Sequence, residues 1–328
     1  MSGKVKLYGV LAGKDHGVIT TDDAGTEVYS IPYRDICCAV SDSNGMAAGD
    51  KKSVLKSLLS YQVVMERIIR KNTIVPIKFG AELGKNDVAM VLEKGYTEFA
   101  QRLSALEGKF ELDVSASWED MEGVIREIAS ENGEVRRLVS AACADTGERL
   151  RLGEAIKDAV ERKRQEAFEK AHGRLAEYAA DSGKNEIAGD KEVFSCAFLV
   201  DREKEGTFSS ALEALAGDLK GMRLKCISPL PPYAFATFEV KKIRREEITK
   251  AMEVLGLGGE ATYGEIKAAY IANTLEFHPD RDPENPSLEK AFARIKEAFS
   301  ILSRCCGKET GIYAGGAEDF FYVERIRV

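Results

Sequence analysis

The order of strand-type and helix-type segments in the first third of the chain restricts the fold more than any other feature of the sequence. Short runs rich in Val, Ile, Tyr and Cys are typical of strands, and apolar side chains at helical spacing are typical of amphipathic helices. By these patterns, strands are predicted at 4–11, 33–41, 73–80 and 108–116, and helices at 51–71 and 86–107. This alternation predicts an α+β fold with helices on one face of a sheet, of the ferredoxin-like kind.

The middle of the chain repeats this pattern after a longer helical stretch. Helices are predicted at 119–141 and 147–180, a strand at 192–201, a helix at 209–221 and a pair of strands within 222–240. These segments predict a second sheet-and-helix unit, and the strand at 108–116 can belong to its sheet. The middle of the long helix, residues 158–178, is charged on most faces and is therefore predicted to be solvated.

Length and charge limit the number of domains and the kinds of partner that this chain can have. The 328 residues predict roughly two domains, or three if one is small. The formal net charge of −7 gives no basic excess to neutralise phosphates, which argues against general binding to nucleic acid. No apolar run reaches the length of a membrane span, and the first residues contain no apolar core of the signal-peptide type. We therefore expect a cytoplasmic protein without nucleic-acid or membrane partners.

The sequence offers little chemistry for catalysis or metal binding. Seven cysteines occur without a CxxC motif or a Cys/His ligand spacing, which predicts reduced and mostly buried thiols. Gly45 and Gly49 precede Asp50 and lack the Gly-Lys-Ser/Thr ending of a phosphate-binding loop. The three histidines have no Cys or carboxylate at ligand spacing, and no nucleophile elbow is present. We predict no enzymatic activity, no catalytic residue, no metal and no cofactor.

Two stretches of the body combine prolines, glycines and aromatic residues: TIVPIKFGAEL at 73–83 and CISPLPPYAFATFEV at 226–240. Pro76 inside a strand predicts an edge strand or a bulge, and Gly80 permits a tight turn. Three prolines stiffen the entry to the last strand, and the aromatic residues after them are predicted to pack inward: Pro229, Pro231, Pro232, Tyr233, Phe235 and Phe238. None of these residues can perform acid–base chemistry, so we interpret them as core and turn residues.

Together with KLYGV at 6–10 and LRLGEAIKDAVERKR at 150–164, these stretches resemble the gas vesicle protein F/L family over residues 1 to about 241. The resemblance implies two modified ferredoxin-like domains and an accessory role in gas vesicle assembly. It also implies the hydrophobic shell protein and other gas vesicle accessory proteins as partners, and it singles out the motif residues Pro76, Phe79, Gly80, Pro231, Pro232, Tyr233 and Phe235. The chain departs from the family's Val-Glu-Trp-Gly type strand, because it has Phe110, Glu111, Leu112 and Asp113 there.

The C-terminal part has helical patterns with recognisable ends. Residues 246–256 form an apolar stripe at helical spacing, and Gly256 fits a C-cap. Thr262 and Glu265 have the spacing of a capping box for the next helix. Ser287 is predicted to cap a third helix, whose apolar residues recur along one face.

Between the second and third helices stands LEFHPDRDPENP at 275–286, a Pro-rich loop with a His-Pro-Asp triplet. Two antiparallel helices joined by such a loop resemble a J-domain of the DnaJ type, over roughly residues 251–303. The resemblance implies that His278, Pro279 and Asp280 contact a DnaK-type chaperone and stimulate its ATPase, with basic residues of the second helix meeting an acidic surface.

The second helix of this segment departs from that family. The positions that are commonly basic hold Ala268, Ile271, Ala272 and Glu276, so Lys267 is the one basic residue between Tyr263 and Glu276. Asn273 replaces an apolar core residue. A J-like fold that is kept as a packing or docking module therefore remains an open alternative.

The charged cluster KKIRREE at 241–247 marks the predicted boundary between body and helical segment. The predicted domains are an N-terminal ferredoxin-like domain, a second α+β domain with long helices, a J-domain-like helical segment and a tail: 1–106, 107–241, 246–304 and 305–328. We expect an accessory factor that binds the gas vesicle shell protein and limits its aggregation. The alternative is a J-domain co-chaperone of a DnaK-type ATPase, whose body binds clients.

Overall fold

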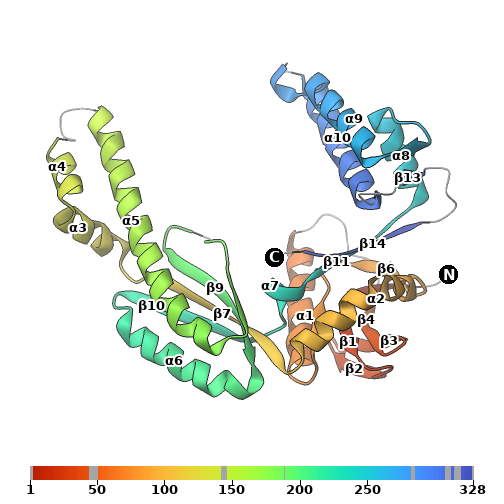
Figure 1. Ribbon diagram of the computed structural model, residues 1–328, viewed down its shortest axis with the longest axis horizontal. Coiled ribbons are helices and arrows are strands. Elements are labelled where there is room, and N and C mark those ends of the chain that lie inside the picture. The colour runs from red at the N-terminus through yellow and green to blue at the C-terminus, as the bar shows by residue number, and fades with distance from the viewer. Residues whose placement is uncertain are drawn as a thin grey trace.

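The computed structural model describes residues 3–43, 51–141, 146–187, 189–281, 285–306, 312–313 and 319–326. The predicted loop around Gly45 and Gly49 lies outside the described residues, as does Pro283. Figure 1 shows an N-terminal unit of strands and helices, a second such unit beside it, and a helical unit above the first. The described cysteines are free thiols, most of them buried, as predicted.

The N-terminal unit contains a sheet with the order β2-β3-β4-β1-β5, in which β6 also pairs with β1. Its strands are β1 (Lys4–Ala12), β2 (Val18–Thr21), β3 (Glu27–Tyr33), β4 (Ile36–Ser43), β5 (Ile74–Pro76) and β6 (Glu82–Gly84). The hairpin of β2 and β3 was not predicted from the sequence. β5 and β6 follow each other along the same edge of β1, and Gly80 turns the chain between them with φ +90°.

Helices α1 (Lys51–Ile69) and α2 (Asp87–Leu106) cover opposite faces of this sheet. The buried residues of α1 pack with Cys37 and Ala39 of β4, whereas those of α2 pack with Cys38 and Val40. The prediction of helices on a single face is therefore wrong for this sheet. The reason is that consecutive apolar residues in β4 point alternately to both faces, so each face needs a cover.

The second unit has a sheet with the order β10-β7-β9-β8. Its strands are β7 (Lys109–Trp118), β8 (Asp181–Lys184), β9 (Glu192–Asp201) and β10 (Met222–Leu230). Helices α5 (Thr146–Leu175) and α6 (Glu205–Asp218) cover the face formed by the even-numbered residues of β7. The predicted second unit is thus present, and it includes the strand that begins near residue 108.

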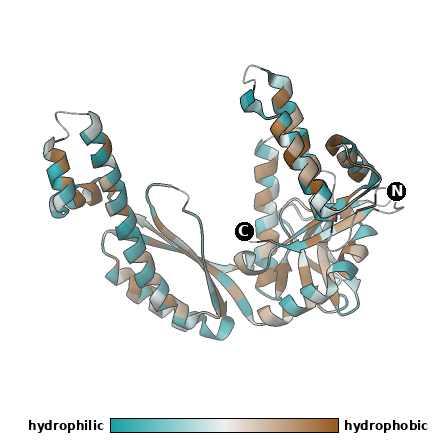
Figure 2. Ribbon diagram, turned by 45° about the horizontal axis from the view of Figure 1, so that its top comes forward, coloured by the Kyte–Doolittle hydropathy of each residue, from teal (hydrophilic) through white to brown (hydrophobic). Residues whose placement is uncertain are grey.

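The outer end of the second unit is a helical arm (Figure 1). The predicted helix at 119–141 is instead two helices, α3 (Met121–Glu131) and α4 (Gly133–Ala141). Asn132 breaks it, because its backbone is extended and its side chain accepts from the N–H groups of Glu134 and Val135. Both helices pack on α5, which Figure 2 shows to be largely hydrophilic, as predicted.

The C-terminal part starts and ends in one two-stranded sheet. Its helices and strands are α7 (Tyr233–Ala236), β11 (Phe238–Ile243), α8 (Arg245–Leu255), β12 (Glu260–Ala261), α9 (Tyr263–Glu276), α10 (Pro286–Cys305), β13 (Ile312–Tyr313) and β14 (Phe320–Arg325). The single-turn 3-10 helices are Ala176–Tyr178, Arg202–Lys204 and Pro279–Arg281. β14 pairs antiparallel with β11, so the chain returns to the body after its helical segment.

Candidate functional site

The two Pro- and aromatic-rich stretches of the body meet at the junction between the two units. Ile77 forms a parallel bridge with Phe238, and the Lys78 N–H donates to the Phe238 carbonyl at 2.8 Å. The Ile77 N–H donates to the Tyr8 carbonyl at 2.9 Å, which ties the same point to β1. Segments that are far apart in the sequence thus form one site, which we call the junction site.

Aromatic rings fill the junction site. Tyr61 of α1 stacks on Tyr8 with ring centroids 5.6 Å apart and meets Phe79 edge-on at 5.5 Å. Its hydroxyl donates to the Ile77 carbonyl at 2.6 Å, and its side chain also hydrogen-bonds that of Tyr233. Burial raises the pKa of both Tyr61 and Tyr233, so the two phenols stay neutral. This packing holds α7 against α1 and β1 of the N-terminal unit.

The remaining motif residues have backbone and core roles. Pro232 is buried, and its carbonyl accepts from the N–H groups of Phe235 and Ala236, which forms the short helix α7. The Pro231 carbonyl accepts from the Tyr233 N–H at 2.7 Å. Pro76 lies in β5, at the end of the sheet path. These positions match the interpretation as core and turn residues.

Sequence reasoning did not single out Glu111 as a site residue, although it noted the unusual strand there. Its side chain is only 2% exposed, and one carboxyl oxygen accepts from the Ala234 N–H at 2.8 Å. Burial raises the pKa of Glu111 to about 8, the Ala234 hydrogen bond opposes this, and Asp113 adds to it. An acidic residue among apolar neighbours in a predicted central strand was the available signal.

The predicted helix ends of the J-like segment are largely confirmed. Gly256 caps α8 with φ +69°, and Thr262 and Glu265 form the capping box of α9. The prediction that Ser287 caps the helix is wrong, because α10 already begins at Pro286 and is capped by Asn285. Proline suits the first helical position since its missing N–H is not needed there.

Asn273 is accommodated in the J-like segment by hydrogen bonds. Its side-chain amide donates to the Leu255 carbonyl at 3.3 Å and to the Ala269 carbonyl at 2.8 Å. The first bond links α9 to α8, so this polar residue is satisfied at a position between two helices. The apolar contacts around it hold the fold: Tyr270 of α9 stacks on Phe299 of α10 at 4.2 Å.

The His-Pro-Asp loop is held from both sides. The His278 ring meets Phe292 of α10 edge-on at 5.2 Å, and its Nδ1 accepts from the Asp280 N–H at 3.2 Å. The Arg281 guanidinium donates to the carbonyls of Leu275 and Glu276, which closes the end of α9. The Asp280 side chain is 89% exposed, so the loop presents a carboxylate to solvent next to an anchored imidazole.

The outward face of α9 is apolar. Ile271 is 48% exposed and Leu275 69% exposed, and Ala268 and Ala272 are exposed beside them. Lys267, also exposed, lies toward one border of this face. The structure therefore places the predicted loop residues together, but Lys267 is not part of a basic surface on α9.

Within the described residues, no group of three or more His, Cys, Asp or Glu side chains is arranged to hold a metal ion. In the same part of the chain, no helix is long and apolar enough to cross a membrane.

The fold is thus a two-unit α+β body that carries a J-like helical segment with a His-Pro-Asp loop. The family model described as "Gas vesicle synthesis protein GvpL/GvpF" matches residues 5–237, and that of the DnaJ domain matches residues 250–308. The chain belongs to the GvpL/GvpF gas vesicle protein family and has a DnaJ domain in addition.

Individual relatives agree with both parts. Gas vesicle protein F of Streptomyces sp. is 27% identical over 198 residues, which are 58% of this chain and 81% of the relative. Human DnaJ homolog subfamily C member 4 is 46% identical over 52 residues, which are 16% of this chain and only 22% of that relative. The crystal structure of GvpF from Anabaena sp. PCC7120 has a TM-score of 0.63 at 18% identity, over 72% of this chain and 98% of that one. At this identity the structural match establishes the body fold alone.

Proposed function

We propose that this protein is an accessory factor of gas vesicle assembly that binds the hydrophobic shell protein, or other accessory proteins, and limits shell-protein aggregation. The observation that carries the proposal is the match of the family model to nearly the whole body, joined on one chain to a chaperone-type domain. The match to the gas vesicle family model supports a non-enzymatic role. We propose that the protein acts in the cytoplasm and on growing gas vesicles.

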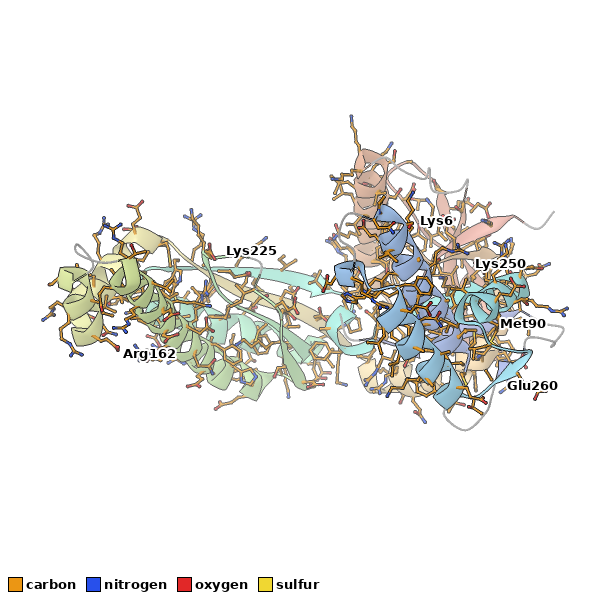
Figure 3. The ribbon with its side chains drawn as sticks, turned by 90° about the horizontal axis from the view of Figure 1, so that it is seen from above. Lys6, Met90, Arg162, Lys225, Lys250 and Glu260 are labelled. Carbon is orange, nitrogen blue, oxygen red and sulfur yellow. The ribbon has the colours of Figure 1, made fainter. Side chains whose placement is uncertain are left out.

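We propose the free edge of β10 as the surface that receives the shell protein. β10 is an end strand of its sheet, and one backbone edge has no strand partner in the described part of the chain. Cys226 is exposed and Ile227 is 42% exposed. Figure 3, which labels Lys225, shows β10 along the border of the second unit. An end strand with exposed apolar side chains can receive an extended apolar segment by strand addition.

Co-expression tests the proposal. The shell protein of the same organism is produced with and without this chain, and its soluble fraction is measured by centrifugation and quantitative blotting. We expect the chain to raise the soluble fraction and to be recovered with the shell protein in a pull-down. Ile227→Asp should reduce both effects, whereas Val18→Asp serves as a matched control because Val18 is 56% exposed on β2, an end strand of the other sheet. Equal insolubility with and without the chain contradicts the proposal.

The second candidate function is that of a co-chaperone of a DnaK-type ATPase. The observation that favours it is the held loop, in which His278 packs on Phe292 and Asp280 faces solvent. The apolar outward face of α9 argues for weak or absent stimulation, since basic residues supply attraction to an acidic partner. Such a DnaK-type partner and the roles of His278, Pro279, Asp280 and Lys267 are therefore proposals.

A further inference from the structure

Helix α1 begins with an apolar and basic surface that nothing in the described chain covers. Leu55 is 56% exposed and Leu59 53% exposed, whereas the buried residues of this helix start at Tyr61. Val54 is 41% exposed and Leu58 is partly exposed beside them. We call these four residues, Val54, Leu55, Leu58 and Leu59, the α1 patch.

Within residues 51–60 of α1, the charged side chains are all positive. Lys51 and Lys56 are exposed, and residues 51–60 contain no acidic side chain. The first turn of α1 therefore has cations where the helix dipole favours anions. A partner with negative charge and an apolar stripe would satisfy both features of this surface.

The outward face of α9 is complementary to the α1 patch. Its exposed apolar residues, Ala268, Ile271, Ala272 and Leu275, recur at helical spacing, and we call them the α9 patch. Glu265 and Glu276 lie along one border, and Asp280 follows the C-terminal end, where the helix dipole is negative. Lys267 on the other border and Arg281 after the helix are the positive groups nearby. Residues 246–304 as a whole have eleven acidic and seven basic side chains.

The two patches are also of similar size. Each covers about two helical turns, or roughly 10 Å of helix.

The charges also distinguish the two possible orientations of the helices. When the helices are antiparallel, the lysines at the start of α1 lie beside Glu276 and Asp280 at the end of α9. Lys56 then faces the border that holds Glu265 and Glu276, whereas a parallel arrangement brings Lys56 toward Lys267. Charge complementarity thus selects one orientation.

Within one molecule these patches do not meet. Figure 1 shows α1 on the body and α9 in the helical unit, apart from each other. The inward face of α9 is already occupied by α8 and α10, around Ile266. We propose that a second copy of this chain is the occupant: the α1 patch of one molecule packs antiparallel on the α9 patch of the next. Such a contact is heterologous, so it leaves one free patch of each kind and allows rings or open chains.

Sedimentation velocity of the full-length chain tests this self-association. A patch of this size makes a weak interface, so the chain is measured from low concentration up to about 200 µM. We expect the weight-average sedimentation coefficient to rise with concentration, and the rise to shrink at high salt because the contact includes opposite charges. Leu150→Glu is the control, since Leu150 is 69% exposed on α5 and belongs to neither patch.

Two double variants make the test specific. One combines Leu55→Glu with Leu59→Glu, and the other combines Ile271→Glu with Leu275→Glu. We expect each variant alone to be monomeric, with an unchanged circular dichroism spectrum. An equal mixture should form a heterodimer that grows no further, because one intact α1 patch meets one intact α9 patch. A monomeric wild type overturns the proposal, and so does a mixture that stays monomeric or a variant that still associates on its own.

Discussion

The ammonium of Lys242 lies 3.0 Å from a carboxylate oxygen of Asp319, and this ion pair joins β11 to the residue that precedes β14. The same ammonium lies 3.0 Å from Asp87, at the start of α2. The charged cluster at 241–247 therefore does not act as a free linker. It begins in a strand and ties the returning end of the chain to the N-terminal unit.

Replacing Lys242 by Met should loosen this connection. The hydrogen bond from Lys242 lowers the pKa of Asp319, and the bonds to Asp319 and Asp87 raise the pKa of Lys242. Because these groups are partly exposed, we expect a loss of about 1 kcal/mol in the free energy of unfolding at pH 7. Urea denaturation of both proteins provides the measurement.

The difference between Lys242→Met and wild type should depend on pH. A carboxylate with a lowered pKa stabilises the fold above its unfolded pKa, and this contribution is lost as the pH falls through the folded value. The two proteins should therefore begin to converge in stability below about pH 4, as the pH approaches the lowered pKa of Asp319. An equal difference at pH 3 and pH 7 would mean that packing of the Lys242 side chain, rather than its charge, holds β14.

The buried carboxyl of Glu111 should give the free energy of unfolding a second pH dependence, of opposite sign. Its pKa is raised from 4.5 to about 8, chiefly by burial, so the folded state retains a proton that the unfolded state has lost. Stability should fall as the pH rises from about 4.5 to about 8, by up to a few kcal/mol in total. Glu111→Gln keeps an acceptor for the Ala234 N–H but cannot ionise, so its stability should vary less over this range. Denaturation at pH 5 and pH 9 compares the two, and parallel losses would refute a buried acid.

A chain that ends at Lys242 should fold, but with reduced stability. One apolar cluster spans both sheet units, and neither it nor the cluster around α2 includes a residue of α8, α9 or α10, so the body's core is built without these helices. The shortened chain lacks β14, whose Phe321 and Val323 pack against the core that contains α2. We expect cooperative thermal melting by circular dichroism, with a midpoint several degrees below that of the body in the full chain. Insoluble or non-cooperative material would show instead that β14 completes the core.

The His-Pro-Asp loop should stimulate a DnaK-type ATPase weakly or not at all. Single-turnover ATP hydrolysis by the host's own chaperone, with wild type and His278→Gln, measures this directly. Adding basic residues to the outward face of α9, as Ala268→Lys with Ala272→Arg, should increase stimulation if charge is what the helix lacks. Strong stimulation by wild type that His278→Gln abolishes would make the protein a working co-chaperone.

Features that depend on neighbouring residues were predictable from the sequence. The capping box of Thr262 and Glu265, the left-handed Gly256 and the strand Glu192–Asp201 all rest on side-chain patterns over a few residues. The same is true of the two resemblances, because their motifs are contiguous. Two predicted helix ends were wrong for local reasons. Asn285, and not Ser287, caps α10, and Asn132 ends α3 where the sequence pattern predicted that the helix continues.

Only the tertiary structure decided which distant segments meet. The pairing of β11 with β14, the bridge between Ile77 and Phe238 and the burial of Glu111 against Ala234 join residues far apart in the sequence. The apolar pattern of a strand indicates that its faces are buried, but it does not indicate which helix or strand covers them. Partner choice depends on the packing of the whole chain, where many weak contacts compete, and periodicity within one segment has no information about that competition.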